Sequence, residues 1–399
     1  MRALGPFLLL LGCQTEIAFP LGGGHFPSPL VPSFVHQARF AITNNRSDSL
    51  SFVTASTSPI TKLGDVPIGD NPVELEGPHH IAASPDGKFL VYNLSNYVPG
   101  TGSGPHGSHG LGNLPGSLVK LDAATMQNLG EALVDRSPGE VILSQDGRFA
   151  YVTHYDLLRE LQALTQGGKE EMAYSALAIV ETATMVRRSL TPVCVTAHGA
   201  GLAADGKTIY LTCAHTDQLA VVDVADPAHP AVVSRLPVGP NPSPFGSPPT
   251  YGPYALSISP GDGSVWISDN NSGDVRVYDP QTGAMDAKRT LFVGGIAMFS
   301  AFSQDGKTLF VPHQGDDKIT LIDTSTLSKK ELSLPAQACL NVHLITLTPD
   351  QKGALVVCEG MPPKRLGSAL SLSLDPLAVT GFVELQQFPD GAAWLPPWP

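Results

Sequence analysis

Two cysteine–histidine–cysteine triplets are the residues whose types and spacing most clearly indicate chemistry. They read Cys194-x3-His198-x14-Cys213 and Cys339-x3-His343-x14-Cys358, and the identical spacing argues against coincidence. A disulfide within each triplet, Cys194–Cys213 and Cys339–Cys358, would close a loop of about 20 residues and contribute about 3 kcal/mol. The alternative is a Cys/Cys/His site for a soft metal such as Cu(I) or Zn, although neither triplet has an obvious fourth ligand. We favour disulfides, because they are the default for paired cysteines in an oxidising compartment and a metal site would lack its fourth ligand.

Histidines recur at one position of a repeated sequence pattern. The position lies seven residues before the Asp of each Asp-Gly turn, with one extra residue in the fourth unit. It holds His79, Gly139, His198, Tyr254, Met298 and His343, with Asp390 in the last unit. A second position, seven residues after the Gly of each turn, includes His154 and His313. The candidate ligand or metal residues are therefore His79, His80, His198, His343, His154, His313, Tyr254 and Asp390.

Imidazoles that converge in one place could bind Cu, Zn, another divalent metal or haem iron, or act as acid–base groups near neutral pH. The alternative is that each histidine hydrogen-bonds to the backbone of a neighbouring repeat and only supports the structure. We favour the structural role for any single histidine. For the cluster of His79, His80, His198 and His343, a metal or polar ligand is the competing interpretation. The chain has no Cys-x-x-Cys-His motif, which excludes covalent c-type haem.

The elements that must position these side chains follow from composition and from the repeat. The 399 residues include 40 Gly and 36 Pro, and 42% are hydrophobic but only 15% charged, which excludes both a helical bundle and a disordered chain. Six units each show an alternating apolar run, an Asp-Gly type turn and a second alternating run, as in residues 79–92 and 198–211. Third and fourth strands follow each turn, and four strands repeated at this spacing predict the blades of an all-β propeller.

The two ends of the chain are predicted to build a seventh blade together. Residues 38–53 supply a second and a third strand with no first strand before them, whereas residues 388–395 supply a first strand with nothing after it. Pairing the two closes the ring and removes its last open edges. We therefore predict one domain, residues 37–399: a seven-bladed β-propeller of four-stranded antiparallel blades.

The repeat motifs also carry a family resemblance. Phe40-Ala-Ile-Thr-Asn44, Leu50-Ser-Phe-Val and the Ser-Pro-Asp-Gly-Lys turns resemble the YVTN-repeat β-propeller family. Its relatives include lactonase-like propellers and the haem-binding propeller of cytochrome-type nitrite reductases. The resemblance implies the fold but leaves the function open, because this scaffold hosts unrelated activities. A metal-dependent lactonase would need converging carboxylates and Asn, for which Asp269, Asn270, Glu359 and Asp390 are candidates.

Three insertions are expected on one face of the propeller. Residues 96–116 and the helix-prone residues 155–172 connect second to third strands, and the Pro-rich residues 239–252 precede a first strand. All three open on the face opposite the Asp-Gly turns. Long loops on one rim of a rigid scaffold are where binding sites are built, although random drift could also produce the arrangement.

The N-terminus predicts export and lipid anchoring. A short apolar run ends in Leu10-Leu11-Gly12-Cys13, which resembles the lipobox of bacterial lipoproteins and implies acylation of Cys13 after removal of residues 1–12. An ordinary cleaved signal with a coincidental Cys is the alternative. Residues 13–36 are predicted to be a tether. Gln14 in place of Asp implies, by the same resemblance, the outer membrane of a bacterial envelope.

Charge and loop placement together predict the partners. The formal net charge is −12 and no basic cluster is present, which makes nucleic acid a poor partner. We expect a monomeric, envelope-anchored binding module whose His-rich loop face recognises an envelope protein, a glycan or a small molecule. The alternative is a metal- or haem-assisted envelope enzyme, either an oxidoreductase or a lactonase-like hydrolase.

Overall fold

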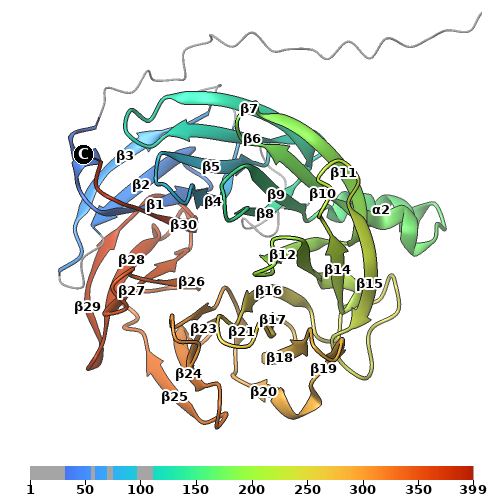
Figure 1. Ribbon diagram of the computed structural model, residues 1–399. Helices are drawn as coiled ribbons and strands as arrows, with labels where there is room; N and C mark the ends of the chain where they lie inside the picture. The colour runs from blue at the N-terminus through green and yellow to red at the C-terminus, as the bar shows by residue number, and fades with distance from the viewer. Residues whose placement is uncertain (1–31, 55–58, 70–74, 97–110, 399) are drawn as a thin grey trace, which may run out of the picture.

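Seven four-stranded antiparallel sheets surround a central axis, as the blades of a propeller do (Figure 1). The computed structural model describes residues 32–54, 59–69, 75–96 and 111–398. Each blade runs outward from an inner strand beside the axis to an outer strand at the rim. The predicted seven-bladed β-propeller is confirmed.

The blades are numbered 1 to 7 in chain order and their strands are given from the axis outward. Blade 1 contains β30 (Pro389–Leu395), β1 (Arg39–Asn44), β2 (Ser49–Thr54) and β3 (Lys62–Pro67). Blade 2 contains β4 (Pro78–Ala83), β5 (Phe89–Leu94), β6 (Pro115–Asp122) and β7 (Asn128–Arg136). Blade 3 contains β8 (Pro138–Leu143), β9 (Phe149–His154), β10 (Tyr174–Glu181) and β11 (Val186–Val195). Blade 4 contains β12 (Ala197–Leu202), β13 (Thr208–Cys213), β14 (Gln218–Asp223) and β15 (Ala231–Pro237).

The remaining three blades follow the same order with local irregularities. Blade 5 contains β16 (Pro253–Ile258), β17 (Val265–Asp269), β18 (Asp274–Asp279) and β19 (Ala284–Met285), and β20 (Leu291–Phe292) also pairs with β18. In blade 6 the inner strand is split into β21 (Ile296–Ala297) and β22 (Ala301–Phe302), followed by β23 (Thr308–Gln314), β24 (Lys318–Asp323) and β25 (Lys329–Ser333). Blade 7 contains β26 (Val342–Leu347), β27 (Gly353–Cys358), β28 (Ser368–Leu374) and β29 (Leu377–Glu384).

The ring closes in blade 1, where the C-terminal strand pairs with the first N-terminal strand. The register aligns Phe40 with Trp394 and Ala41 with Ala393, as the sequence predicted. Arg39, only 1% exposed, donates from its guanidinium to the carbonyl oxygens of Val35 (2.6 Å) and Ala123 (2.7 Å). This buried cation therefore ties the closing blade to blade 2.

The Asp-Gly turns are built as predicted. Gly87, in the turn of blade 2, has φ = +69°, a conformation that glycine adopts without a steric penalty. The Ser84 hydroxyl donates to Asp86 Oδ1 (2.8 Å), and the backbone N–H of Lys88 donates to the same oxygen (3.1 Å). Because the same side chains recur in other blades, the turns fix the register of each inner hairpin.

Adjacent blades are joined by a repeated hydrogen bond. Side chains at one position of the second strands donate to the carbonyl oxygen of the second residue on the next inner strand. The pairs are Thr43 with His79, Asn93 with Gly139, Thr153 with His198, and Thr212 with Tyr254. The repeat therefore holds the second residues of neighbouring inner strands in a fixed relation to one another.

The segment before blade 1 contributes to the packed domain. Residues Ser33–His36 form a short 3-10 helix, η1, inside the segment predicted to be a tether. Phe34 and Val35 are 7% and 2% exposed, and the Phe34 ring lies 4.7 Å from that of Phe52. Apolar side chains therefore bind residues 33–36 to the propeller. The predicted signal peptide, Cys13 and most of the tether lie outside the described residues.

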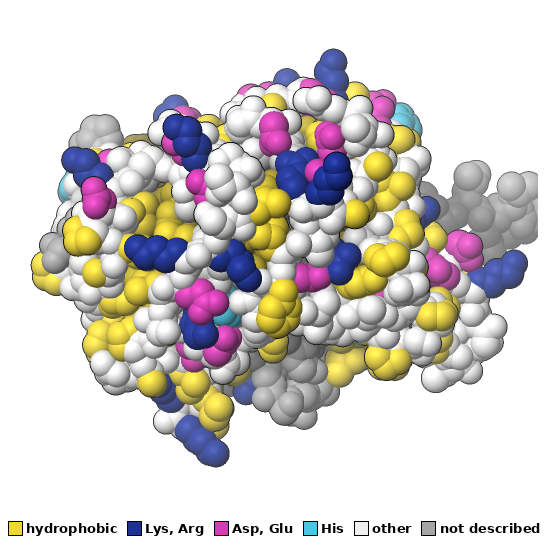
Figure 2. All heavy atoms as spheres, turned by 90° about the horizontal axis from the view of Figure 1, so that it is seen from below, with side chains coloured by type: hydrophobic (Ala, Val, Ile, Leu, Met, Phe, Trp, Pro, Cys, Tyr) yellow, Lys and Arg dark blue, Asp and Glu magenta, His cyan; other side chains and the backbone are white. Residues whose placement is uncertain are grey.

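The surface carries basic, acidic and apolar side chains side by side. On the face seen in Figure 2, Lys and Arg side chains are interspersed with Asp, Glu and apolar side chains rather than gathered into one basic patch. Within the described part of the chain, no helix has the length and apolar character needed to cross a membrane.

Candidate functional site

The inner strands place the predicted ring of residues at the same end of the propeller, beside the central axis. Each ring residue is the second residue of its inner strand: His79, Gly139, His198, Tyr254, His343 and Asp390 in β4, β8, β12, β16, β26 and β30. Met298 directly follows β21. All seven of these residues are buried, and His79, His198 and His343 have no exposed surface. Counting from the turns therefore located the ring correctly.

Three imidazoles of this ring region form a compact group. His79, His80 and His198 each offer a ring nitrogen, and the three atoms lie within 4.8 Å of one another. The His79 and His80 rings meet edge to face at 4.5 Å, and the His79 and His198 rings do so at 5.7 Å. All three side chains are buried. We call His79, His80 and His198 the histidine cluster.

A second group shares His80 with the histidine cluster. The ligand atoms of His80, His343 and Asp390 also lie within 4.8 Å of one another. Asp390 spans two imidazoles: Oδ1 is 2.8 Å from Nε2 of His343, and Oδ2 is 3.2 Å from Nε2 of His79. One carboxylate therefore links the histidine cluster to His343.

His343 is held in a charged environment. Its Nδ1 lies 2.6 Å from Oε1 of Glu359, which directly follows β27. Burial alone would lower the pKa of His343, but the charge of Asp390 and the hydrogen bonds to Asp390 and Glu359 outweigh burial and raise the pKa to about 10. At neutral pH this imidazole is therefore a cation between two carboxylates.

The other ring nitrogens of the cluster are fixed by neighbouring blades. His79 donates from Nδ1 to the carbonyl oxygen of Gly139 (3.2 Å), and His198 donates from Nδ1 to that of Tyr254 (3.2 Å). The rings of His198 and Tyr254 also stack at 3.8 Å. A backbone carbonyl at Nδ1 sets both the tautomer and the orientation of an imidazole, as it does for metal-binding histidines.

Two aromatic residues beside the cluster were missed by the sequence analysis. Phe299 lies between the split halves of the blade 6 inner strand and pairs with Leu344 of blade 7, which places its ring 4.6 Å from His80 and 5.3 Å from His343. Tyr155, the first residue after β9, has its ring 5.4 Å from that of His198. A broken strand and a loop residue carry no repeat signal, so no spacing could identify them.

His154 and His313 do not join the cluster. Nδ1 of His154 donates to the carbonyl oxygen of Ala176 (2.7 Å), and its Nε2 accepts from the backbone N–H of Asp135 (2.9 Å). His313 lies 2.8 Å from Asp316 and 3.0 Å from the Thr320 hydroxyl. His154 thus bonds to the backbone of the next strand of its blade and of β7 in blade 2, which is the structural role considered for single histidines, whereas His313 bonds to side chains of its own blade.

The cysteines form the two predicted disulfides. Cys194–Cys213 and Cys339–Cys358 have S–S distances of 2.07 and 1.99 Å. Cys194–Cys213 joins the end of β11, in blade 3, to the end of β13, in blade 4, and Cys339–Cys358 joins the segment before β26 to the end of β27. The disulfides therefore brace the two inner strands that carry His198 and His343.

Two insertions pack together on the face that carries the ring. Residues 155–172 form helix α2 (Leu157–Thr165) and begin η2 (Glu170–Ala173), as the helix-prone sequence predicted. A Cβ at Gly246, in the loop of residues 239–252, would lie only 2.7 Å from Leu164 of α2. Asp217 anchors that loop by accepting four backbone N–H groups from it. The third insertion falls largely on residues 97–110, with His106 and His109, which lie outside the described residues.

The carboxylates expected for a lactonase-like site are divided by the structure. Asp390 is part of the ring, and Glu359 contacts the ring through His343. Asp269 instead lies 3.1 Å from Nε of Arg276, and the other carboxylate on that arginine is Asp274. Burial, with the neighbouring Asp274 charge, raises the pKa of Asp269 well above its usual value. Asp269 is therefore part of a separate ion-pair network in blade 5.

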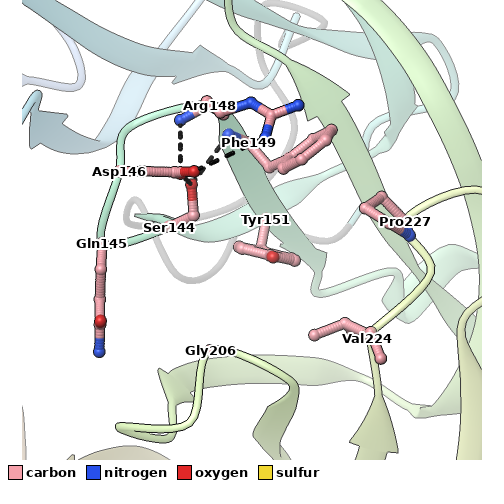
Figure 3. A pocket seen from close by; sticks show the side chains of 10 residues that line it. Ser144, Gln145, Asp146, Arg148, Phe149, Tyr151, Gly206, Val224 and Pro227 are labelled. Atoms are coloured by element: carbon pink, nitrogen blue, oxygen red, sulfur yellow. Dashed lines mark hydrogen bonds and ion pairs between the residues drawn. The ribbon is translucent and has the colours of Figure 1, made fainter.

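A shallow hollow of about 460 Å³ lies on the opposite face, between the turn of blade 3 and blade 4 (Figure 3). Ser144, Asp146, Arg148 and Tyr151 line one side, and Pro227 lies across from them. Ser144 and Asp146 hydrogen-bond to each other within the turn (2.6 Å). No residue of the ring reaches this hollow, and its polar groups serve the turn.

Comparisons with known proteins bear on the fold. No protein-family model matches the chain, and no curated protein matches it. Among solved structures, the periplasmic gluconolactonase of Pseudomonas aeruginosa is 15% identical, with a TM-score of 0.65 over 90% of this chain and 99% of that one. A protein from Lactobacillus plantarum is 15% identical, with a TM-score of 0.65 over 90% of this chain and 100% of that one. The hydrazine synthase of Kuenenia stuttgartiensis is 21% identical, with a TM-score of 0.54 over 77% of this chain and 80% of that one. The chain therefore has the seven-bladed propeller fold that lactonase-like proteins also use, as the resemblance in its sequence implied.

Proposed function

We propose that the histidine cluster binds a transition-metal ion and that the protein is a metal-dependent hydrolase of a lactone or a related ester. The observation that carries the proposal is the combination of three buried imidazoles within 4.8 Å with carbonyl groups that orient two of them. Imidazole donors suit Zn, Cu, Fe and Ni rather than Mg or Ca. The short distances between the imidazole rings of the cluster suit a single metal ion better than a haem macrocycle.

The reaction class follows from the donor set and from the fold. Three histidine ligands with an open position are one arrangement of a catalytic zinc site. Such an ion supplies Lewis-acid chemistry toward a carbonyl group when it is bound. His343 and Asp390 would then lie beside the ion as a charged pair that binds a polar substrate group. A propeller of similar fold is named as a gluconolactonase, which supports a lactone as the first substrate class to test.

Metal titration tests the proposal. Protein freed of metal by a chelator is titrated with Zn(II), Co(II) and Cu(II), and the bound ion is counted after gel filtration. We expect one ion per chain in the wild type and a loss of binding in His80→Gln and His198→Gln. When the free ion is present at 100 times its Kd, binding should also raise the free energy of unfolding by about 2.7 kcal/mol. A panel of sugar lactones is then assayed with the metal-loaded and the metal-free protein.

The matched control is His229→Gln. The His229 side chain is 83% exposed and its Nδ1 lies 2.8 Å from Asp226 at the surface, so the variant should bind metal as the wild type does. Retention of no ion by the wild type would contradict the metal site. Equal retention by His198→Gln would contradict the assigned ligands. An ion that binds as proposed but supports no lactone hydrolysis, with Cu or Fe preferred, would favour the oxidoreductase alternative.

An interaction module is the second candidate, and exposed apolar side chains favour it. Leu161, Leu164 and Met172, on α2 and η2, are 50%, 38% and 53% exposed on the insertion beside the ring. A partner protein or glycan in the envelope could cover them. In a pull-down from envelope extract, Leu161→Glu should then lose the partner while its metal content and thermal stability stay unchanged. Capture that Leu161→Glu leaves intact would exclude this surface.

We also propose that the protein is anchored in the bacterial envelope by a lipid on Cys13, most simply in the outer membrane. The support is the sequence Leu10-Leu11-Gly12-Cys13. Metabolic labelling with a fatty acid should mark the wild type and leave Cys13→Ala unmarked. Mass spectrometry should find a mature chain that begins at Cys13. A labelled Cys13→Ala variant would contradict the anchor.

A further inference from the structure

The blade 3 insertion folds so that one glutamate is fixed beside the ring. Asp156, fully buried, accepts the backbone N–H of Arg159 (2.9 Å) and caps α2. Its Oδ2 also binds Nε of Arg159 (3.0 Å) and Nε of Arg136 (3.1 Å). This ion-pair network orients the first turn of the helix. Glu160, in that turn, is only 6% exposed.

Glu160 begins a hydrogen-bonded chain of three side chains. Its Oε2 lies 2.6 Å from Nδ1 of His215, and Nε2 of His215 lies 3.4 Å from the hydroxyl of Tyr155. The carboxylate therefore holds a proton on Nδ1, which leaves Nε2 to accept the phenol proton. His215 is anchored by its own backbone N–H, which donates to Oγ1 of Thr196 (3.0 Å). The chain is assembled from the β9 end, helix α2 and the segment after β13.

Tyr155 is the member of this hydrogen-bonded chain that contacts the histidine cluster. Its ring meets the His198 ring edge to face at 5.4 Å and the Tyr254 ring at 6.0 Å. The side chain of His215 is 27% exposed, whereas Glu160 is almost buried. The three residues therefore span the distance between solvent and the buried cluster.

We infer that Tyr155, His215 and Glu160 form an acid–base unit of the site, in which Tyr155 is the catalytic residue that exchanges a proton with a bound substrate. The inference rests on the proposed function in one respect, namely that the substrate binds at the histidine cluster. His215 acts through Tyr155 as the proton acceptor, and Glu160 acts through His215 as a positioning residue. The order of phenol, imidazole and carboxylate matches that of hydroxyl, imidazole and carboxylate in hydrolytic triads, but here the phenol passes a proton and does not attack the substrate.

The proton balance of the unit is simple. When water attacks the bound lactone or ester carbonyl, the Tyr155 oxygen takes a proton from that water while its own O–H proton moves to Nε2 of His215. The imidazolium so formed is stabilised by the Glu160 carboxylate. The relay then runs in reverse: His215 returns the proton to the phenol oxygen, which passes one to the leaving oxygen of the substrate as the bond from that oxygen to the carbonyl carbon breaks. The reaction consumes one water and needs no oxidant or reductant.

An aryl sulfonyl fluoride tests the unit without a known substrate. In this reaction the Tyr155 oxygen forms a bond to sulfur, fluoride leaves and His215 takes the proton. Labelled tyrosines are identified by peptide mass spectrometry, with metal-free protein in one arm and zinc-loaded protein in the other. We expect Tyr155 to react before the other tyrosines. Labelling should fall about tenfold or more in His215→Ala, because general-base assistance is typically worth at least that much.

Further variants separate chemistry from structure. Glu160→Gln should slow the labelling of Tyr155 less than His215→Ala does, whereas Glu171→Gln, an exposed residue of η2 on the same insertion, should not change it. Imidazole added to the buffer should restore labelling in His215→Ala, which a purely structural role would not allow. Tyr210→Phe, in the core of blade 4, serves as the tyrosine control.

The outcomes distinguish this inference from the proposed function. Selective, His215-dependent labelling of a protein that retains no metal would support the acid–base unit and overturn the metal site. Metal binding as proposed, together with a Tyr155 that reacts no faster than other tyrosines, would overturn the acid–base unit. Labelling that is equal in wild type and His215→Ala, with or without imidazole, would overturn it as well.

Discussion

Oε1 of Glu359 lies 2.6 Å from Nδ1 of His343, and the Glu359 side chain is only 5% exposed. On the other side of the imidazole, Nε2 of His343 lies 2.8 Å from Oδ1 of Asp390. One imidazolium is thus placed between a carboxylate that directly follows the second strand of blade 7 and one from the strand that closes the ring. The ion pair of His343 with Asp390 therefore links the charge of the site to the strand that closes the propeller.

The first prediction concerns the pH dependence of stability. The two carboxylates raise the pKa of His343 to about 10 in the folded protein. A raised pKa means that the stabilisation is complete below the unfolded value of about 6.5 and is lost as the pH rises through about 10. Metal-free protein should therefore lose thermal stability over this window, as measured by calorimetry.

In Glu359→Gln, the stabilisation that protonated His343 provides should be lost at a lower pH than in the wild type. Removing one charge lowers the pKa of His343, so stability should begin to fall earlier than in the wild type. The change can be followed directly by NMR titration of the His343 ring. Glu384→Gln, an exposed residue of β29, is the control and should titrate as the wild type does. A His343 midpoint that Glu359→Gln leaves unchanged would contradict the assignment.

The second prediction concerns two glycines that allow the inner strands to approach. A Cβ at Gly391 would lie 2.9 Å from the Cα of His80, and one at Gly199 would lie 2.7 Å from the carbonyl oxygen of Tyr254. Gly391→Ala and Gly199→Ala should each cost about 1–3 kcal/mol in urea unfolding. Both should also weaken metal binding, because the cluster backbone must shift. Gly261→Ala, whose Cβ would meet nothing closer than 3.7 Å, should have little effect on either measurement.

The third prediction concerns the disulfides. Removing either pair, Cys194–Cys213 or Cys339–Cys358, as a double Cys→Ala variant should lower the free energy of unfolding by about 2–5 kcal/mol. Thiol titration of denatured, unreduced protein that begins after Cys13 should find no free thiol among these four residues. Four reactive thiols would contradict both bonds. The affinity for metal should fall in the Cys194–Cys213 variant, since that bond braces the strand of His198.

The fourth prediction concerns Glu140, which joins two inner strands. Its Oε2 accepts the backbone N–H of Ala200 (2.6 Å), and burial raises its pKa to about 8. The raised pKa means that its stabilisation is complete below about 4.5 and is lost as the pH rises through about 8. Glu140→Gln keeps an acceptor for Ala200 without a charge, so its unfolding temperature should fall less between pH 5 and pH 8. A profile identical to that of the wild type would contradict this role.

The ring could be located from the sequence because it depends on local rules. Alternating strands and Asp-Gly turns fix the register of each inner hairpin, so a constant count from the turn reaches the same height in successive blades. His79, His198, His343 and Asp390 were found in this way. The paired cysteines followed from the same regularity, because the start of a first strand and the end of a second lie side by side.

The number of residues between a turn and a candidate residue could not show whether the side chain of that residue points into the site. His154 has the same regular relation to its turn, yet its imidazole bonds to the backbone of Ala176 in its own blade and of Asp135 in blade 2. The direction of a side chain at a strand end depends on the loop that follows and on the neighbouring blade. Neither is encoded in the distance from a turn.

The sequence by itself determined the seven blades, the closing strand, the two disulfides and the height of the histidine ring, since each depends on contacts within a hairpin or on a simple repeat. Only the tertiary structure decided which histidines meet, that Phe299 crosses to blade 7 beside them, and that Glu160, His215 and Tyr155 form one chain. These contacts join residues from separate blades and insertions. Their geometry exists only when the ring has closed and the insertions have packed against it.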